Sequence, residues 1–66
     1  MSVAKVIEIS AESKQGFEDA INQGVKAAAK TIRNIKGGWV KEQQVVIEDG
    51  KIVTYRVNMQ LTFVLE

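Results

Sequence analysis

The sequence contains no cysteine, no histidine and no proline among its 66 residues. Without cysteine, the chain has no disulfide, no iron–sulfur ligand and no thiol nucleophile. Without histidine, it lacks the usual zinc ligands and the commonest general acid and base. The serine, lysine, tyrosine and carboxylate side chains that remain show no activated pair at a diagnostic spacing. The sequence therefore predicts a protein that is not an enzyme and holds no metal.

An excess of one charge and long apolar runs are also lacking. Nine basic residues face eight acidic ones, which leaves a net charge of +1 and no electrostatic footprint for nucleic acid. No apolar run approaches the roughly 20 residues of a membrane span. Lys5 and Glu8 interrupt the apolar N-terminal stretch that a signal peptide needs. We expect a cytoplasmic protein without a nucleic-acid or membrane partner.

The chain is short for a stable monomer. Residues 1–66 are predicted to form a single domain of 7.3 kDa. Apolar burial on folding is worth roughly 95 kcal/mol. Ordering the chain costs roughly 100 kcal/mol. Because no disulfide or zinc site can tip this balance, the arithmetic predicts a homo-oligomer.

Residue preferences, capping residues and the spacing of apolar residues predict a strand and then a long helix. Val3–Ser10 is rich in β-branched residues and is typical of a strand. Lys14–Ile35 is predicted to be helical, with Ser13 as its N-cap and Gly37 as the left-handed residue after its last turn. Its apolar stripe recurs at three- and four-residue steps and comprises Phe17, Ala20, Ile21, Gly24, Ala28, Ile32 and Ile35.

Two further strands are predicted on either side of Asp49-Gly50, a strong hairpin signal. The second strand alternates strictly and presents one apolar face, formed by Val53, Tyr55, Val57, Met59, Leu61, Phe63 and Leu65. That strand spans about 50 Å, whereas the predicted helix spans about 33 Å. One helix cannot cover the whole face, which again predicts that other copies of the chain cover part of it.

The register of this hairpin has two candidates. A two-residue turn would pair Gln44 with Tyr55 and would place Glu42 on the apolar side. A three-residue loop over Glu48-Asp49-Gly50, with a left-handed bulge at its glycine, would pair Trp39 with Met59. We favour the loop, because a slip of one residue moves every side chain to the wrong face. It places Trp39, Val45 and Ile47 on the apolar side.

Over essentially its whole length the chain resembles the dodecin family. The resemblance rests on KVIEIS at residues 5–10, on the helix start at Ser13 with Phe17 and Ala20 behind it, and on EDGKIVTYRVNMQLTFVLE at residues 48–66. It implies an α+β fold, in which a β-α-β-β subunit wraps a three-stranded antiparallel sheet partly around one long helix. It also implies a hollow homo-dodecamer that stores or quenches a flavin, riboflavin or FMN, without catalysing a reaction.

The resemblance also implies where a ligand would bind. Flavin-binding dodecins carry a tryptophan after the helix and a glutamine after the tyrosine of the last strand. Alignment on the turn places these at Gly37 and Arg56, and the only tryptophan of this chain is Trp39. Glu42 falls where flavin-binding relatives often have an acid. The candidate ligand-binding residues are Trp39, Arg56, Glu42 and Gly37.

Each candidate also has a plainer interpretation. Trp39 either stacks on a flat heterocycle or fills an interface against Met59. Arg56 either binds the ligand or pairs with an acid such as Glu42 or Glu48. Carboxylates of the hairpin offer oxygen ligands to a hard cation at a symmetry axis, although such charges are usually only solvated. The alternative function is accordingly a flavin-free shell of the same fold with a structural, ion-binding or interaction role.

Overall fold

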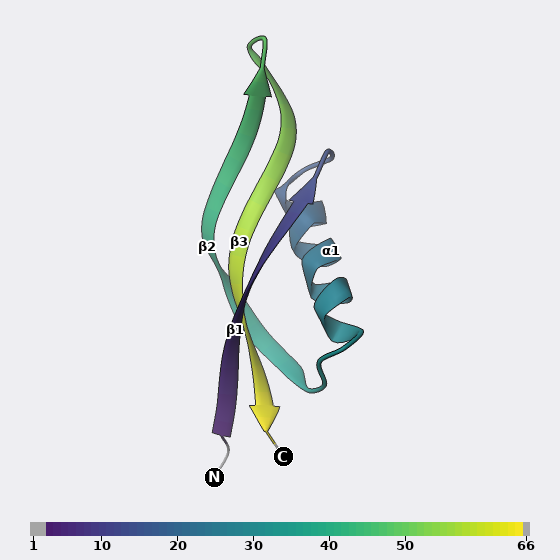
Figure 1. Cartoon of the computed structure of the whole chain (residues 1–66), viewed down its shortest axis with the longest axis vertical. Coiled ribbons are helices and arrows are strands. Elements are labelled where there is room, and N and C mark those ends of the chain that lie inside the picture. Colours follow the sequence, from purple (N-terminus) through teal and green to yellow (C-terminus); the bar gives the residue numbers. More distant parts are fainter. Residues whose placement is uncertain (1–2, 66) are drawn as a thin grey trace.

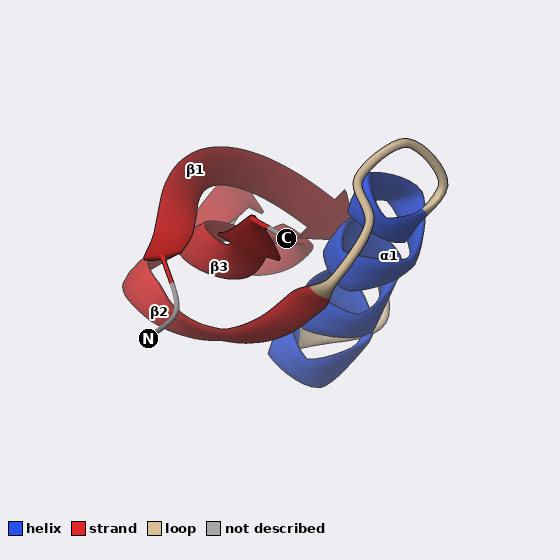
Figure 2. Ribbon diagram, turned by 90° about the horizontal axis from the view of Figure 1, so that it is seen from below, coloured by secondary structure: helices blue, strands red, loops and turns tan. Residues whose placement is uncertain are grey.

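A three-stranded antiparallel sheet carries a single helix on one face (Figure 1). This computed structural model describes residues 3–65, so positions 1, 2 and 66 of the predicted domain lie outside it. The elements are strand β1 (Val3–Ser13), helix α1 (Phe17–Ala29), strand β2 (Ile35–Glu48) and strand β3 (Lys51–Leu65). The strand order is β1-β3-β2, and the sheet curls partly around the helix (Figure 2). The predicted β-α-β-β, α+β fold is confirmed.

The helix begins later than the sequence pattern predicts. Its N-cap is Gly16, with no capping hydrogen bond from a side chain, whereas Ser13 is the last residue of β1. The Ser13 hydroxyl accepts a hydrogen bond from the Gln15 N–H at 2.9 Å and donates one to the Asp19 carboxylate at 2.6 Å. The prediction of Ser13 as N-cap is therefore wrong. Its hydroxyl instead links the end of β1 to the first turn of the helix.

The helix also ends earlier, at Ala29 instead of Ile35. Asn34 takes the left-handed conformation that was predicted for Gly37, with φ of 63°. The Asn34 carbonyl accepts a hydrogen bond from the Val64 N–H at 3.0 Å, which starts the pairing of β2 with β3. Asparagine tolerates this conformation better than most residues with a side chain. The helical spacing therefore continues past the helix into residues that join the sheet.

The core lies between the helix and the middle of β3. Ala20, Val57, Met59 and Leu61 are buried, and the apolar side of α1 packs around them, which confirms the predicted stripe over the helix that forms. The rings of Phe17 and Tyr55 meet edge to face, with centroids 5.2 Å apart. This contact closes the core near the N-terminal end of α1.

The hairpin turn has two residues instead of the predicted three. Glu48 pairs with Lys51, and both Asp49 and Gly50 have positive φ, at 51° and 75°. This is the combination that a type I′ hairpin turn requires. The pairing then shifts by one residue between Val46 and Ile47, so Gln44 pairs with Arg56, which neither predicted register gives.

Two more register shifts interrupt β2 on either side of Trp39. They fall between Ile35 and Gly37 and between Val40 and Glu42. The shift between Val40 and Glu42 cancels the one near the turn, so Trp39 pairs with Gln60, as an unshifted two-residue turn would pair it, and not with Met59. The prediction that Trp39 lies on the apolar side is wrong, because paired residues share a face and Gln60 lies on the side away from the helix.

The sheet is much longer than the helix that covers it. The 13 residues of α1 span about 20 Å, whereas the 15 residues of β3 span about 50 Å. The described chain measures 51 Å along its longest axis. Large apolar side chains stay exposed toward both ends of the sheet, namely Val3, Val6 and Leu65 near the chain ends and Val45, Ile47 and Ile52 near the hairpin turn.

Candidate functional site

The face of the sheet away from α1, called here the outer face, carries three rows of paired residues. β3 contributes the middle member of each row, Arg56, Asn58 or Gln60, because alternate residues of a strand share a face. The strand pairing then defines the rows as Trp39–Gln60–Glu8, Glu42–Asn58–Ser10 and Gln44–Arg56–Glu12. The outer face is therefore polar, with one indole at its side.

Hydrogen bonds between side chains run across these rows. The Gln60 amide donates to the Glu8 carboxylate at 3.0 Å, and Lys41 Nζ reaches the same oxygen at 3.5 Å. The Asn58 amide donates to Glu42 Oε1 at 2.9 Å. Lys41 reaches Glu8 from the register shift between Val40 and Glu42. These contacts hold amide and carboxylate groups in fixed positions on an exposed surface.

Arg56 forms an ion pair, but with neither of the acids that the sequence suggested. Its Nε and Nη2 atoms both lie 2.8 Å from Glu12 Oε2. The Glu42 carboxylate accepts a hydrogen bond from Asn58, and Glu48 lies at the turn, opposite Lys51 in the strand pairing. Arg56 and Glu12 are neighbours across β1 and β3, so this ion pair bridges these two strands on the outer face.

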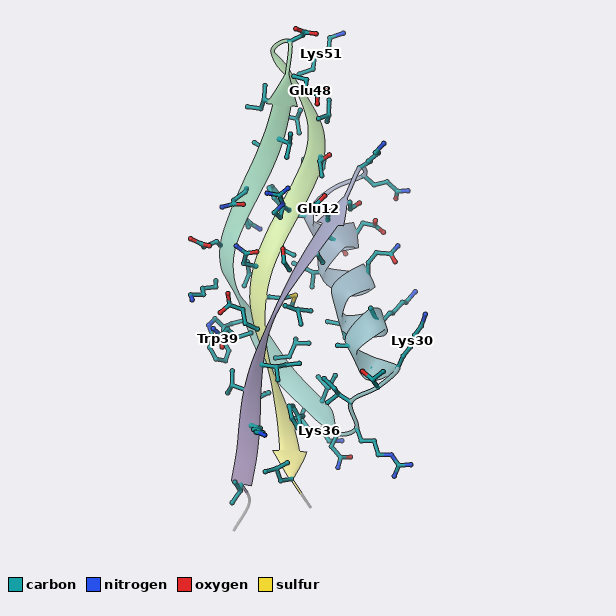
Figure 3. The ribbon with its side chains drawn as sticks, viewed as in Figure 1. Glu12, Lys30, Lys36, Trp39, Glu48 and Lys51 are labelled. Carbon is teal, nitrogen blue, oxygen red and sulfur yellow. The ribbon has the colours of Figure 1, made fainter. Side chains whose placement is uncertain are left out.

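Trp39 projects from β2 on the side opposite α1 (Figure 3). Its side chain is 51% exposed, a large fraction for an indole. Gly37 lies two residues before it on the same face and leaves that place without a side chain, with Thr62 as its neighbour across the strand. The structure therefore brings Trp39, Gly37, Glu42 and Arg56 onto one face, in separate rows.

Sequence reasoning missed four residues of this face: Glu8, Glu12, Asn58 and Gln60. A signal for them was present, because the polar positions of β3 alternate strictly with its apolar ones, and Glu8 and Glu12 alternate with apolar residues in β1. Among the described residues no three acidic side chains come close enough together to hold a metal ion. An exposed indole beside fixed amides and carboxylates instead has the groups that hold a flat, polar-edged molecule by stacking and hydrogen bonds.

Comparison with protein-family models gives a match to Dodecin over residues 3–66. Among known proteins, the calcium dodecin of Mycobacterium tuberculosis is 32% identical over 63 residues, which cover 96% of this chain and 89% of the relative. No helix within residues 3–65 has the length and apolar character to span a membrane.

Solved structures of dodecins superpose closely on this fold. A variant of the Thermus thermophilus dodecin matches with a TM-score of 0.94 and 32% identity, covering 100% of this chain and 98% of that one. The dodecin of Streptomyces davaonensis matches with a TM-score of 0.93 and 29% identity, covering 98% and 96%. The calcium-chelating dodecin of Mycobacterium tuberculosis, described with a novel calcium-binding site, matches with a TM-score of 0.83 and 33% identity, covering 98% and 93%.

Proposed function

The chain belongs to the dodecin family, and from this premise we propose that it is a cytoplasmic homo-dodecamer that binds and stores a flavin, riboflavin or FMN. Its role is binding and not catalysis, because the outer face offers stacking and hydrogen-bonding groups and no activated nucleophile or base. Residues 1–66 act together as one domain in this assembly.

The observation that carries the proposal is the half-exposed indole of Trp39 on a polar sheet face. Offset stacking of a flat heterocycle on an indole is worth about 0.5–1.5 kcal/mol beyond the area it buries. Gly37, two residues away on the same face, leaves space for a ring that extends past the indole. The ligand would lie over the row that Trp39 forms with Gln60.

The polar groups of the outer face would fix the orientation of the ligand. Gln60 and Asn58 carry amides that both donate and accept, which suits the alternating donors and acceptors of a flavin edge. Glu42 is held near that row by its hydrogen bond from Asn58. Arg56 presents a planar cation that suits a carbonyl or phosphate oxygen of the ligand.

Fluorescence of the single tryptophan tests this proposal directly, because all indole emission comes from Trp39. Titration with riboflavin is expected to quench that emission strongly at micromolar concentrations. The matched variants Trp39→Phe and Trp39→Leu separate stacking from bulk: the first should still quench the emission of riboflavin itself, and the second should not. Unchanged tryptophan emission at high-micromolar riboflavin would contradict flavin binding.

Native mass spectrometry of the protein as purified tests the assembly at the same time. A dodecameric mass that carries flavin-sized increments supports both parts of the proposal. A bare dodecameric mass that takes up no added riboflavin keeps the assembly and rejects the ligand. A monomer or dimer contradicts the shell.

An ion-binding role is the second candidate, because a relative with 32% identity carries the name calcium dodecin. In this chain the exposed carboxylates of Glu8, Glu12 and Glu42 share the outer face, but each is already engaged by a cation or an amide. The described residues of one chain do not form a calcium site. Calcium binding would therefore need carboxylates from more than one copy.

Thermal unfolding in calcium and in EDTA distinguishes the two candidates. An ion-binding shell should melt several degrees higher with millimolar calcium than with EDTA, and Glu42→Gln should abolish the difference if that carboxylate is a ligand. Equal melting temperatures in calcium, magnesium and EDTA would leave the flavin proposal standing alone.

A further inference from the structure

The β2–β3 hairpin extends past the N-terminal end of α1 (Figure 1), and this part of the sheet carries exposed apolar residues. Val45, Ile47 and Ile52 lie on this part, here called the hairpin overhang, and are 37%, 59% and 50% exposed. Val45 pairs with Tyr55 on the helix-side face, and Ile47 lies two residues further along β2 on the same face. Ile52 pairs with Ile47 beyond the extra residue Val53 of β3, so it joins them on that face. No part of α1 lies over them.

A second apolar surface without a partner lies toward the opposite end of the molecule. The α1–β2 groove is a hollow of about 360 Å³ between the helix and the start of β2, with Lys36 among its lining residues. Gly38 lies at the floor of this groove and packs closely against β3. A Cβ at that position would lie 2.6 Å from the Gln60 carbonyl oxygen. Its apolar lining residues are Ile21, Val25, Ile35, Met59 and Leu61.

We propose that the hairpin overhang of one copy packs into the α1–β2 groove of a second copy. This inference rests on the homo-oligomeric part of the proposed function and specifies which surfaces meet. A chain cannot fill its own groove, because its overhang lies at the other end of a sheet that runs most of the 51 Å length of the molecule (Figure 3).

Charge favours this pairing of surfaces. Glu48 and Asp49 place two carboxylates at the tip of the overhang, and Lys51 adds one ammonium group, so the tip has a net charge of −1. Lys36 lines the groove, and Lys30 and Arg33 lie in the adjoining segment that leads from α1 to β2. Apolar side chains would thus meet apolar side chains while opposite charges meet around them, the arrangement that gives an interface its register.

The exposed area of the chain also fits an interface of this kind. The surface measures 4919 Å², whereas a compact monomer of this mass exposes about 4,200 Å². The excess, about 700 Å², is close to the roughly 800 Å² per partner that a standard specific interface buries. Each chain would use two patches, its overhang and its groove, so this excess corresponds to the area of one of the two.

Cysteine cross-linking tests the contact, because the native chain has no cysteine. The double variant Val25→Cys/Ile47→Cys carries one thiol in the groove and one on the overhang, too far apart to join within a chain. Oxidation, or a short bis-maleimide, is expected to link chains into a ladder of covalent multimers on a denaturing gel. Lys26→Cys/Ile47→Cys is the matched control, because residue 26 is exposed and is not among the groove residues.

A charge exchange supplies the second readout. Lys36→Glu and Glu48→Lys alone should each raise the concentration at which the assembly dissociates by about tenfold or more, and the double variant should recover most of that loss. If the wild-type protein assembles normally but Val25→Cys/Ile47→Cys gives no ladder, this inference is wrong. The proposal of a homo-oligomer would then still stand. A wild-type monomer by native mass spectrometry overturns the assembly as well, whereas riboflavin titration reports on the outer face independently.

Discussion

The two faces of the sheet are built from alternate residues of the same strands, yet they differ in almost every physical respect. On the helix side, Val57, Met59 and Leu61 of β3 are buried. On the outer face, Asn58 and Gln60 lie between them in sequence and hold exposed carboxylates by hydrogen bonds. Burial of apolar area drives folding, whereas exposed polar pairs contribute little to it. The helix-side face therefore provides most of the stability, and the outer face is free to serve a ligand.

The strongest test of this comparison places the same charge on each face. Leu61→Asp buries a carboxylate without a partner where the side chain is 2% exposed, and we expect it to cost more than about 4 kcal/mol and to abolish folding and assembly. Thr62→Asp, one residue further on the outer face, should retain the native circular dichroism spectrum with a cost of about 1 kcal/mol. A stable, soluble monomer of Leu61→Asp would show that the core does not depend on assembly.

A methyl group added to each of two adjacent glycines gives the next largest difference. Gly38→Ala places a Cβ 2.6 Å from the Gln60 carbonyl oxygen and 2.8 Å from Leu61 Cδ2, and should cost about 1–3 kcal/mol. Gly37→Ala meets only the Thr62 hydroxyl at 3.3 Å, which can rotate, and should cost less than about 0.5 kcal/mol. Urea unfolding of the two variants measures both, and equal costs would refute the close approach at Gly38.

Two serines of β1 give a polar version of the same contrast. Ser13 is 9% exposed and bonds the Asp19 carboxylate and the Gln15 N–H, so Ser13→Ala should cost about 1–2 kcal/mol. Ser10 is exposed and lies opposite Asn58 on the outer face, so Ser10→Ala should change stability by less than about 0.5 kcal/mol. Thermal melts of the two variants should therefore separate clearly.

The smallest effect is expected from the ion pair of the outer face. Arg56→Gln removes its contact with Glu12, where the two side chains are 37% and 50% exposed, and should cost less than about 1 kcal/mol. The cost should shrink further in high salt, because screening weakens an exposed pair. A loss of several kcal/mol that persists in molar salt would place this pair among the main supports of the fold.

Much of the fold was predictable from the sequence. The alternation of β3, the Asp49-Gly50 turn and the apolar stripe of the helix each identify their element, since they reflect burial along one chain segment. The helix end was not predictable from spacing, because Ile32 and Ile35 continue the stripe by position alone. Hydrogen bonding of Asn34 to Val64 in β3 ended the helix instead, and that competition depends on a strand thirty residues away.

The site was predictable only in part, for a related reason. The four candidate residues do share one face, but the preferred register placed Trp39 on the other. The preferred three-residue loop is one residue out of register, and such a slip moves a side chain to the other face. The shifts between Val46 and Ile47 and between Val40 and Glu42 cancel before Trp39 is reached. Register shifts leave the alternation of β3 unchanged, so its pattern contains no record of them. Lys41 lies at the register shift between Val40 and Glu42 and contacts Glu8 from there. Nothing in the sequence distinguishes it from any other exposed lysine.

The place of β3 in the sheet has a consequence for how the chain is made. β3 lies in the middle and pairs with both other strands, yet it leaves the ribosome after all of them. Until it emerges, β1 and β2 have no partner, and α1 with 13 residues is only marginally helical in water. The three earlier elements therefore gain the strand that holds them together only once β3 has been made. The β2–β3 hairpin can then close locally, and β1 joins last across the longest loop, as Val3 finds Leu65.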